Sequence, residues 1–302
     1  MDRRTFLKGM GAAIFLPTII PASALGRDGF VAPSNRVVMG SIGLGGMGSN
    51  NTRSFLGDKR VQLVALCDPC MKDNRYGYSH NATCGALAFK EKNNLTDVKI
   101  YKDFRELLAR EDIDAITTAT PDHWHAIIGI ACANAGKDVY GEKPLTRTIE
   151  EGRYLSNAVR RNGVIWQTGS WQRSQHDFWY AAELVRTGAI GKVKLIKIGL
   201  PRNNEIKPLA PEPVPETLDW DLWLGPAAFA DFHPFRAFTT WRFFTEYSAG
   251  KIGDWGAHHL DIAQWAMGYH LQGAKTIEPL NVSWPKDGFY DSPTTFTVRY
   301  TY

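Results

Sequence analysis

From about residue 36 onward, short apolar runs alternate with longer stretches in which apolar residues recur every three or four positions. The short runs predict strands, and the longer stretches predict amphipathic helices. This alternation is typical of parallel strands joined by helical crossovers, so we expect a doubly wound α/β sheet. The expected strands are Val37–Ile42, Val61–Cys67, Ile113–Ala119, Asp138–Tyr140 and Val164–Thr168, and the expected helices are Gly46–Gly57, Asn81–Asn93, Phe104–Arg110, His123–Asn134 and Ile149–Asn162.

The pattern changes after Gly169, where aromatic residues and prolines become frequent and the regular alternation stops. We therefore divide the chain into a Rossmann domain at 36–168 and a second, α+β domain at 169–302 with an open, mostly antiparallel sheet. The last seven residues alternate like a half-buried strand, so this strand is expected to be a sheet edge or to continue into a longer chain. The expected elements are a helix at Asp177–Thr187, a strand at Lys192–Leu200, an irregular segment at Pro201–Trp241, a helix at Lys251–Gly268, and strands at Ala274–Trp284 and Thr294–Tyr302.

The amino terminus resembles an export signal of the twin-arginine type. Arg3 and Arg4 precede a mildly apolar stretch, and small residues end it at Ala24. The apolar stretch is too short to span a bilayer, so we expect no stable membrane insertion. The interpretation is a signal peptide at 1–24 and a linker at 25–35, with export to the periplasm or beyond. The export machinery is then a partner, and such machinery carries folded proteins that often hold a cofactor already.

Composition excludes several other classes. The chain has 302 residues, 44% of them hydrophobic, and 35 basic against 31 acidic residues leave a net charge of only +4. This charge is too small and too dispersed for a nucleic-acid-binding surface. Four cysteines are too few for a disulfide framework. Cys67 and Cys70 have the spacing of a redox pair but not its strand-to-helix context, so no chemistry is assigned to them.

A glycine-rich sequence directly follows the first expected strand and opens the first helix. Gly43 permits a tight turn, Gly45 lets the backbone approach a pyrophosphate, and Gly48 permits close packing of helix and strand. Met47 lies in the same turn and is included among the expected cofactor contacts. Asp68 follows the second strand, where a carboxylate accepts hydrogen bonds from ribose hydroxyls and repels a 2′-phosphate. The pattern predicts a dinucleotide site that prefers NAD over NADP.

A second polar loop follows the strand predicted at 113–119. In an open α/β sheet, ligands bind beyond the carboxyl ends of the strands, so Thr120, Pro121 and His125 are expected to line the cofactor site. His123 and His125 flank a tryptophan and also suggest a metal pair. Their spacing matches no standard zinc pattern, and we expect no metal there.

The next strand ends in Gly141-Glu142-Lys143-Pro144-Leu145. Together with the glycine motif, Asp68 and the Thr-Pro loop, this sequence resembles the Gfo/Idh/MocA oxidoreductases from Val37 to about Gly268. The resemblance implies that Lys143 reaches a substrate hydroxyl beside the nicotinamide and that Glu142 shapes the cofactor pocket. An ammonium group suits this role because it polarises an oxygen during hydride transfer. Family members usually pair through the second domain, so a homo-oligomer is also implied.

The resemblance extends to Asp254-Trp255-Gly256-Ala257-His258. Residues four apart share one helical face, so Asp254 and His258 are expected to point together into a cleft. His258 is the expected general base, oriented by Asp254. A metal site formed by Asp254, His258 and Asp261 is the alternative, although the family chemistry needs no metal.

Further substrate contacts are expected from Trp171, Arg173 and His259. Flat aromatic rings suit the C–H faces of sugars, although tryptophan is more often a core residue. Arg173 follows the last strand of the first domain, where hydrogen bonding between domains is an equal alternative. His259 lies on a different helical face from His258, and a purely structural role is the other interpretation.

The function that follows is hydride transfer between a nicotinamide cofactor and a secondary alcohol of a sugar, glycoside or cyclitol. Because no free NAD pool exists outside the cytoplasm, the cofactor is expected to be loaded before export and retained. A redox-neutral, NAD-dependent glycoside hydrolase is the first alternative, but the hydrolases of this kind lack the lysine motif that this chain keeps. A non-catalytic sugar- or nucleotide-binding protein is the second.

Overall fold

The computed structural model describes residues 31–75, 83–238, 240–269 and 271–302. The predicted signal peptide at 1–24 and most of the linker lie outside these residues. Within them, the first element is a short 3₁₀ helix, η2 (Pro33–Asn35), which leads into the first strand. No helix in the described ranges is long and apolar enough to cross a membrane.

One parallel sheet organises the first half of the described chain, as predicted, and it has six strands rather than the five expected. Its order is β3-β2-β1-β4-β5-β6. The chain proceeds from β1 in one direction and from β4 in the other, so the carboxyl ends of β1 and β4 flank a topological switch point, where such folds bind ligands. The strands are β1 (Val37–Ile42), β2 (Val61–Cys67), β3 (Lys99–Tyr101), β4 (Ala115–Thr118), β5 (Asp138–Glu142) and β6 (Trp166–Gly169).

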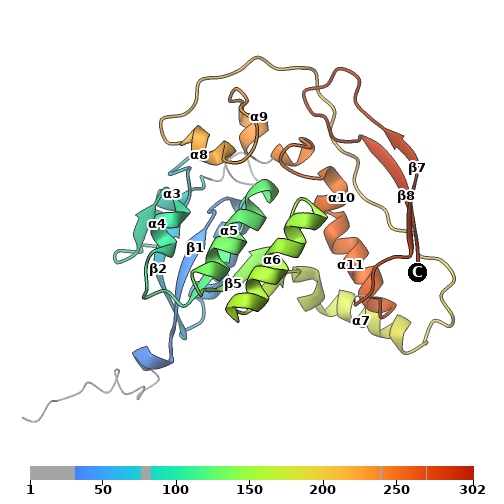
Figure 1. The fold of residues 1–302 in the computed structure, drawn as a ribbon, viewed down its shortest axis with the longest axis horizontal. Coiled ribbons are helices and arrows are strands. Elements are labelled where there is room, and N and C mark those ends of the chain that lie inside the picture. The colour runs from blue at the N-terminus through green and yellow to red at the C-terminus, as the bar shows by residue number, and fades with distance from the viewer. Residues whose placement is uncertain (1–30, 76–82, 239, 270) are drawn as a thin grey trace, which may run out of the picture.

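Helices cover both faces of this sheet. On one face, α4, α5 and α6 pack together and enclose a core that includes Leu107, Ile116 and Ile128. On the other face, α2 and α3 enclose a smaller core around Leu44, Leu66 and Phe89. Figure 1 shows α5 and α6 side by side in front of the strands. The helices are α2 (Gly46–Leu56), α3 (Ala86–Lys92), α4 (Phe104–Leu108), α5 (Asp122–Asn134) and α6 (Ile149–Asn162).

The second half is less regular than predicted. The expected strand at Lys192–Leu200 is wrong: this segment has no strand partner, and its side chains are mostly exposed. The sheet of this half consists of β7 (Thr276–Ser283) paired antiparallel with β8 (Thr295–Thr301), and every residue of β7 is exposed. In Figure 1 this hairpin stands apart at the edge of the molecule. A strand needs a neighbouring strand with which to form hydrogen bonds. The apolar pattern at Lys192–Leu200 predicted a strand because a pattern does not show whether such a neighbour exists.

The expected single helix at Lys251–Gly268 is two helices, α10 (Gly250–Asp254) and α11 (Gly256–Ala266), which meet at Trp255. Trp255 has φ −82° and ψ −30°, so the backbone continues in nearly helical geometry through the joint. The helix predicted at Asp177–Thr187 is present as α7 (His176–Arg186) and packs against α11. The strand β6 leads to α7 through the 3₁₀ helix η3 (Trp171–Ser174).

The Pro- and Trp-rich segment contains a core of its own, built from buried aromatic rings such as those of Trp223, Phe232 and Tyr247. Trp220 and Trp223 stack with their ring centroids 4.8 Å apart. This core is tied to the first domain, because Leu218 forms a bridge with Cys70 just beyond β2. Its short helices are α8 (Trp220–Leu224), α9 (Pro234–Ala237) and η4 (Trp241–Phe243).

Candidate active site

At Gly43 and Gly48 the turn between β1 and α2 has no room for a side chain. Gly43 has φ +84°, and a Cβ there would lie 2.7 Å from the carbonyl oxygen of Ala119. A Cβ on Gly48 would lie 1.8 Å from the carbonyl oxygen of Gly43. No side chain caps the amino terminus of α2 at Gly45, so its first amides are available to an anion. The turn therefore has the close backbone packing and the free helix terminus of a dinucleotide cradle.

Asp68, the predicted ribose ligand, lies fully buried under this turn. Its Oδ2 accepts a hydrogen bond from the Leu44 amide at 2.5 Å, and its Oδ1 accepts one from the Cys70 amide at 2.8 Å. The carboxylate thus holds the glycine-rich turn against the end of β2. To bind a ribose hydroxyl as well, the carboxylate must turn toward solvent or accept the hydroxyl beside its two hydrogen bonds from the backbone amides.

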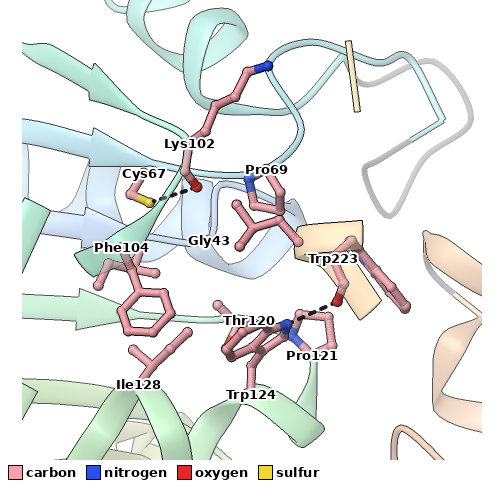
Figure 2. Close-up of a pocket in the computed structure, with 12 residues that line it drawn as sticks. Gly43, Cys67, Pro69, Lys102, Phe104, Thr120, Pro121, Trp124, Ile128 and Trp223 are labelled. Carbon is pink, nitrogen blue, oxygen red and sulfur yellow. Dashed lines mark hydrogen bonds between the residues drawn. The ribbon is translucent and has the colours of Figure 1, made fainter. Parts of the chain in front are cut away.

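A small apolar cavity lies at the carboxyl ends of β1, β2 and β4, beside the glycine-rich turn (Figure 2). Thr120 and Pro121, which are expected to contact the cofactor, form part of its wall. Leu222 and Trp223 of the second domain form another part, and the Trp124 Nε1 donates a hydrogen bond to the Trp223 carbonyl at 2.9 Å. At about 30 Å³ the cavity has room for about one water, and the side chain of Lys102 extends away from it (Figure 2).

The polar atoms around the strand ends fit a bound dinucleotide. Thr120 Oγ1 and Gln172 Oε1 are buried without a hydrogen-bond partner. A buried polar atom left unpaired is costly, so such atoms are expected to find partners on a ligand. Together with the glycine-rich turn, they support a cofactor bound across β1, β4 and β5.

Lys143, at the turn after β5, meets Asp254, at the end of α10. The Lys143 Nζ donates to Asp254 Oδ1 at 2.9 Å and to the Asp254 carbonyl at 3.2 Å. These residues are 111 positions apart, so the contact joins the two domains at the predicted catalytic residues. An ammonium has three N–H groups, and these two bonds leave one for a substrate oxygen.

Two further cations surround the same carboxylate. The Lys251 Nζ lies 3.2 Å from Asp254 Oδ2, and the Arg242 Nε lies 3.4 Å from Oδ1. Burial raises the pKa of the Asp254 carboxyl, but the charges of Lys143, Arg242 and Lys251 outweigh this effect and bring the pKa to about 2. Asp254 is therefore a carboxylate at any physiological pH, and it keeps Lys143 oriented.

Sequence reasoning missed Arg242 and Lys251. Arg242 lies between Trp241 and Phe243 in η4, and nothing in its local sequence links it to Asp254. Lys251 is three residues before Asp254, a spacing that places two side chains on the same helical face. This spacing could have identified Lys251 as a partner of Asp254 from the sequence.

His258 is buried in α11 and lies against the ring of Trp171. The Trp171 Nε1 donates to His258 Nε2 at 3.2 Å. Because the indole nitrogen only donates, Nε2 carries no proton and the neutral ring is protonated at Nδ1. Burial and the neighbouring charge of Lys143 lower the pKa of His258 to about 4. His258 is thus a neutral histidine whose Nε2 is ready to accept a proton.

Arg173 forms an ion pair and also lines a polar cavity. Its Nε and Nη2 donate to the two carboxylate oxygens of Asp261 at 2.6 and 2.7 Å. This pair joins η3 to α11, which is the interdomain role that the sequence left open. His259 stacks on Trp255 with ring centroids 5.6 Å apart. A polar cavity of about 410 Å³ adjoins the pair and is lined by Tyr140, Gln167, Thr168, Ser170, Trp171, Arg173, Ser174 and Asp261.

We expect that replacing Arg173 by methionine lowers the free energy of unfolding by about 1 kcal/mol, because a partly exposed but bidentate ion pair is lost. The KM for the alcohol substrate should not change. Thermal unfolding and steady-state kinetics of R173M, D261N and the double variant measure this. A raised KM without loss of stability would instead make Arg173 a substrate ligand.

Glu142 and His125 are both buried close to Lys143. Glu142 Oε1 accepts a hydrogen bond from Asn51 of α2 at 2.9 Å, which holds the end of β5 against the helix that follows the glycine-rich turn. The two ring nitrogens of His125 lie 2.6 Å from the Pro144 carbonyl and 2.8 Å from the Thr120 carbonyl. Both residues therefore support the cofactor loops from within the protein.

The alternatives that involve metals and cysteines find no support in the described chain. No group of three His, Cys, Asp or Glu residues in the described ranges could hold a metal ion. The four cysteines are free and buried, and burial raises the pKa of each thiol, that of Cys132 to about 12. Such thiols are protonated and unreactive.

The parallel sheet, its switch point and the glycine-rich turn after β1 have the architecture of an NAD-binding Rossmann domain. Residues 37–170 match the family described as "Oxidoreductase family, NAD-binding Rossmann fold", and residues 203–287 match its "C-terminal alpha/beta domain". The chain belongs to the Gfo/Idh/MocA oxidoreductase family.

Solved structures share this fold. The myo-inositol 2-dehydrogenase of Lactobacillus plantarum has a TM-score of 0.55 and 23% identity, covering 82% of this chain and 60% of that one. The WlbA dehydrogenase of Bordetella pertussis, in complex with NADH and UDP-GlcNAcA, has a TM-score of 0.53 and 18% identity over 81% of this chain and 61% of that one.

Among curated proteins, a "Glycosyl hydrolase family 109 protein" of Shewanella sp. (strain W3-18-1) is 28% identical over 216 residues. A protein of the same name from Shewanella baltica (strain OS195) has the same identity and coverage. The match covers 64% of this chain and 44% of each relative, so this chain spans less than half the length of the curated proteins it matches.

Proposed function

We propose that this protein is an NAD-dependent oxidoreductase that oxidises a secondary alcohol of a sugar, glycoside or cyclitol, or reduces the corresponding ketone. The observation that carries the proposal is the contact of Lys143 with Asp254 beside a neutral His258. When bound, the nicotinamide supplies the acceptor for the hydride. The family name supports the redox chemistry, and the glycosyl hydrolase names of the curated relatives support a carbohydrate substrate.

In this proposal each residue has a separate task. Lys143 uses its third N–H to hold the substrate oxygen and to stabilise negative charge that develops on it. His258 accepts the hydroxyl proton at Nε2, where the substrate hydroxyl replaces the indole N–H of Trp171 as donor. Asp254 keeps the ammonium charged and in place.

The low pKa of His258 predicts an unusual pH dependence. A histidine with a pKa of about 6.5 loses its ability to accept a proton below neutrality. His258 stays neutral until the pH approaches about 4, so kcat/KM for alcohol oxidation is expected to remain level through pH 6.5 and to fall only near pH 4. Initial rates across this range measure it, and an inflection near pH 6.5 would exclude His258 as the base.

The same shift affects stability. His258 binds its proton less tightly in the folded chain than in the unfolded chain, so at low pH its protonation favours the unfolded chain. The free energy of unfolding is therefore expected to decrease as the pH falls from about 6.5 to about 4. His123, whose pKa burial also lowers to about 4, adds to this acid sensitivity. Urea unfolding at several pH values measures the slope, and H123F should reduce it.

Cofactor retention and export are part of the proposal. Two backbone hydrogen bonds tie the second domain to the loop after β2. The Met71 amide donates to the Thr217 carbonyl at 2.8 Å, and the Asp219 amide donates to the Pro69 carbonyl at 2.9 Å. These bonds favour slow release of NAD, as an exported enzyme without a free NAD pool requires. Fractionation of producing cells should place the mature protein in the periplasm, shortened by the signal peptide and carrying a nucleotide.

The names of the curated relatives favour a second candidate, a redox-neutral glycoside hydrolase in which NAD is reduced and reoxidised within one turnover. Absorbance of the nicotinamide and release of free sugar, recorded together on a panel of sugars and glycosides, separate the two. A net absorbance change with a free sugar supports the dehydrogenase. Cleavage of a glycoside without net absorbance change supports the hydrolase, and binding without either change supports a non-catalytic protein.

A further inference from the structure

Three basic side chains converge on the single carboxylate of Asp254. The Lys143 Nζ donates to Oδ1 at 2.9 Å, and the Lys251 Nζ donates to Oδ2 at 3.2 Å. The Arg242 Nε lies 3.4 Å from Oδ1. All four side chains are largely buried, where charges are screened much less than at the surface. Three positive charges therefore share one negative charge in the candidate active site.

Lys251 uses little of its hydrogen-bonding capacity within the protein. Among the described residues, Asp254 is the only carboxylate in ion-pair contact with it. Within the same part of the chain, its Nζ donates to no other oxygen, and its remaining contact is with the ring of Phe243, whose centroid lies 5.2 Å away. Because an ammonium has three N–H groups, two of them are left for a ligand. Lys251 can therefore bind an anion while it stays paired with Asp254.

Lys251 and Arg242 are as accessible to a small molecule as Lys143 is. The side chain of Lys143 is 13% exposed, that of Lys251 is 14% exposed, and that of Arg242 is 18% exposed. The Arg242 guanidinium lies 4.3 Å from the centroid of the Trp241 ring, a stacking contact that restrains the planar group. Since all three cations contact one carboxylate, a small ligand at Lys143 lies close to the other two.

Two other buried carboxylates, Asp122 and Glu142, lie near this group and have partners of their own. Ser248 Oγ donates to Asp122 at 2.6 Å, and Asn51 Nδ2 donates to Glu142 at 2.9 Å. Burial raises the pKa of Asp122, which weakens it as a counter-charge. Neither carboxylate forms an ion pair with Lys251 in the described chain. An anion on a bound ligand would supply a counter-charge that Lys251 otherwise shares with two other cations.

The backbone of Lys251 is fixed by a distant segment of the chain. Its amide donates to Asn203 Oδ1 at 3.1 Å. The preceding residue, Gly250, has φ +61°, and a Cβ there would lie 2.9 Å from Asn203 Nδ2. The ammonium of Lys251 is therefore held beside Asp254 before any ligand binds, and a preorganised cation loses less freedom when it binds an anion.

We propose that the substrate carries an anionic group, a carboxylate or a phosphate, close to the hydroxyl that Lys143 holds, and that Lys251 and Arg242 bind this group. An anion that accepts their hydrogen bonds offsets the surplus positive charge of the buried cluster, and such charge-assisted bonds are strong. The inference rests on the proposed function, which it narrows from sugar alcohols in general to acidic or phosphorylated sugars.

Equilibrium binding to the NAD-loaded full chain tests the inference without turnover. Tryptophan fluorescence is titrated with neutral sugars and their anionic partners: glucose with glucuronate and with glucose phosphorylated at its primary hydroxyl, and the same set for galactose. At least one anionic sugar is expected to bind about 10–100-fold more tightly than its neutral partner, the usual effect of hydrogen bonds to a charged group. Comparison of the acids with the phosphates identifies the anion. If no anionic sugar binds more tightly than its neutral partner, the proposal is overturned.

Ionic strength provides a second readout of the same titrations. Raising NaCl from about 0.05 M to about 0.5 M is expected to weaken binding of the anionic sugar and to leave binding of the neutral sugar unchanged, because salt screens charge–charge attraction. Equal salt dependence of the two sugars would contradict recognition by charge.

Variants of Lys251 separate anion binding from a structural role. K251M is expected to weaken binding of the anionic sugar by about tenfold and to leave the neutral sugar unaffected, whereas K251R, which keeps the charge, should restore most of the affinity. Asp254 retains Lys143 and Arg242 as partners, so the variant should fold. K59M, at an exposed lysine, is the matched control. An equal loss of affinity for both sugars, or reduced thermal stability with an unchanged preference, would make Lys251 only a structural partner of Asp254.

The outcomes separate this inference from the proposed function. Tight, salt-sensitive binding of an anionic sugar that never reduces NAD would support the anion site and contradict the proposed function. Reduction of NAD by neutral sugars, without preference for anionic ones, would support the proposed function and overturn the inference.

Discussion

Replacing Lys143 by methionine is expected to lower kcat for hydride transfer by about 10²–10⁴-fold, the usual size of a lost general acid–base or polarising group. Methionine keeps the length and apolar stem of lysine but removes the N–H groups that hold the substrate oxygen. The fold should tolerate the change, because Asp254 still has Lys251 at 3.2 Å and Arg242 at 3.4 Å and is not left as an unpaired buried charge.

Single-turnover reduction of NAD, followed by nicotinamide absorbance, measures this loss directly. K59M, which removes an exposed lysine of the same domain, is the matched control and should leave the rate unchanged. Thermal unfolding and NAD titration of K143M establish that the variant is folded and binds cofactor. A K143M protein with an unchanged rate would show that Lys143 only pairs with Asp254.

Replacing Gly48 by alanine is expected to have the second largest effect, because the new Cβ would lie 1.8 Å from the Gly43 carbonyl oxygen. The neighbouring atom belongs to the backbone and cannot rotate away, so the turn itself must shift. Overpacking of this kind costs about 1–3 kcal/mol of stability. If the same distortion acts on the amides that face the cofactor, NAD binding weakens by about 10–100-fold, since 1.4 kcal/mol corresponds to a factor of ten.

Gly57, at the other end of the same helix, provides the control. It has φ −71°, and a Cβ there would lie 3.3 Å from the Ser54 carbonyl oxygen, a tight but tolerable contact. Differential scanning calorimetry and titration of NAD by tryptophan fluorescence should show G57A close to wild type and G48A impaired in both. Equal NAD affinity in the two variants would contradict the assignment of the turn to the cofactor.

Local pattern predicted most of the first domain because each signal lies within a few residues. The glycine motif could be placed between β1 and α2 from spacing alone, since the turn requires glycine at Gly43, where φ is +84°. The strand β3 was missed because three residues carry too little pattern. The segment at 192–200 was wrongly expected to be a strand, because strand formation depends on a partner that the segment itself does not encode.

In the candidate site, too, some residues were predicted from the sequence, and others are recognised only in the structure. Lys143, Asp254 and His258 were predicted from short motifs, and the structure brings Lys143 and Asp254 into contact and places His258 within the influence of the Lys143 charge. Arg242 joins the same group from η4, which no spacing rule connects to α10. For Arg173 the sequence left substrate binding and hydrogen bonding between the domains equally open, and the structure pairs it with Asp261, a choice that only the approach of α11 to η3 decides.

The sequence by itself determined most of the strands and helices of the first domain, the glycine turn and the residue types available for chemistry, because periodicity and turn chemistry act over distances of a few residues. Only the tertiary structure decided which charges meet and which atoms of each side chain are engaged. His125 illustrates this: its position in α5 is encoded locally, whereas its partners at Thr120 and Pro144 lie on two different loops. Hydrogen bonding and burial act through space rather than along the chain, so these partners are decided by the tertiary structure.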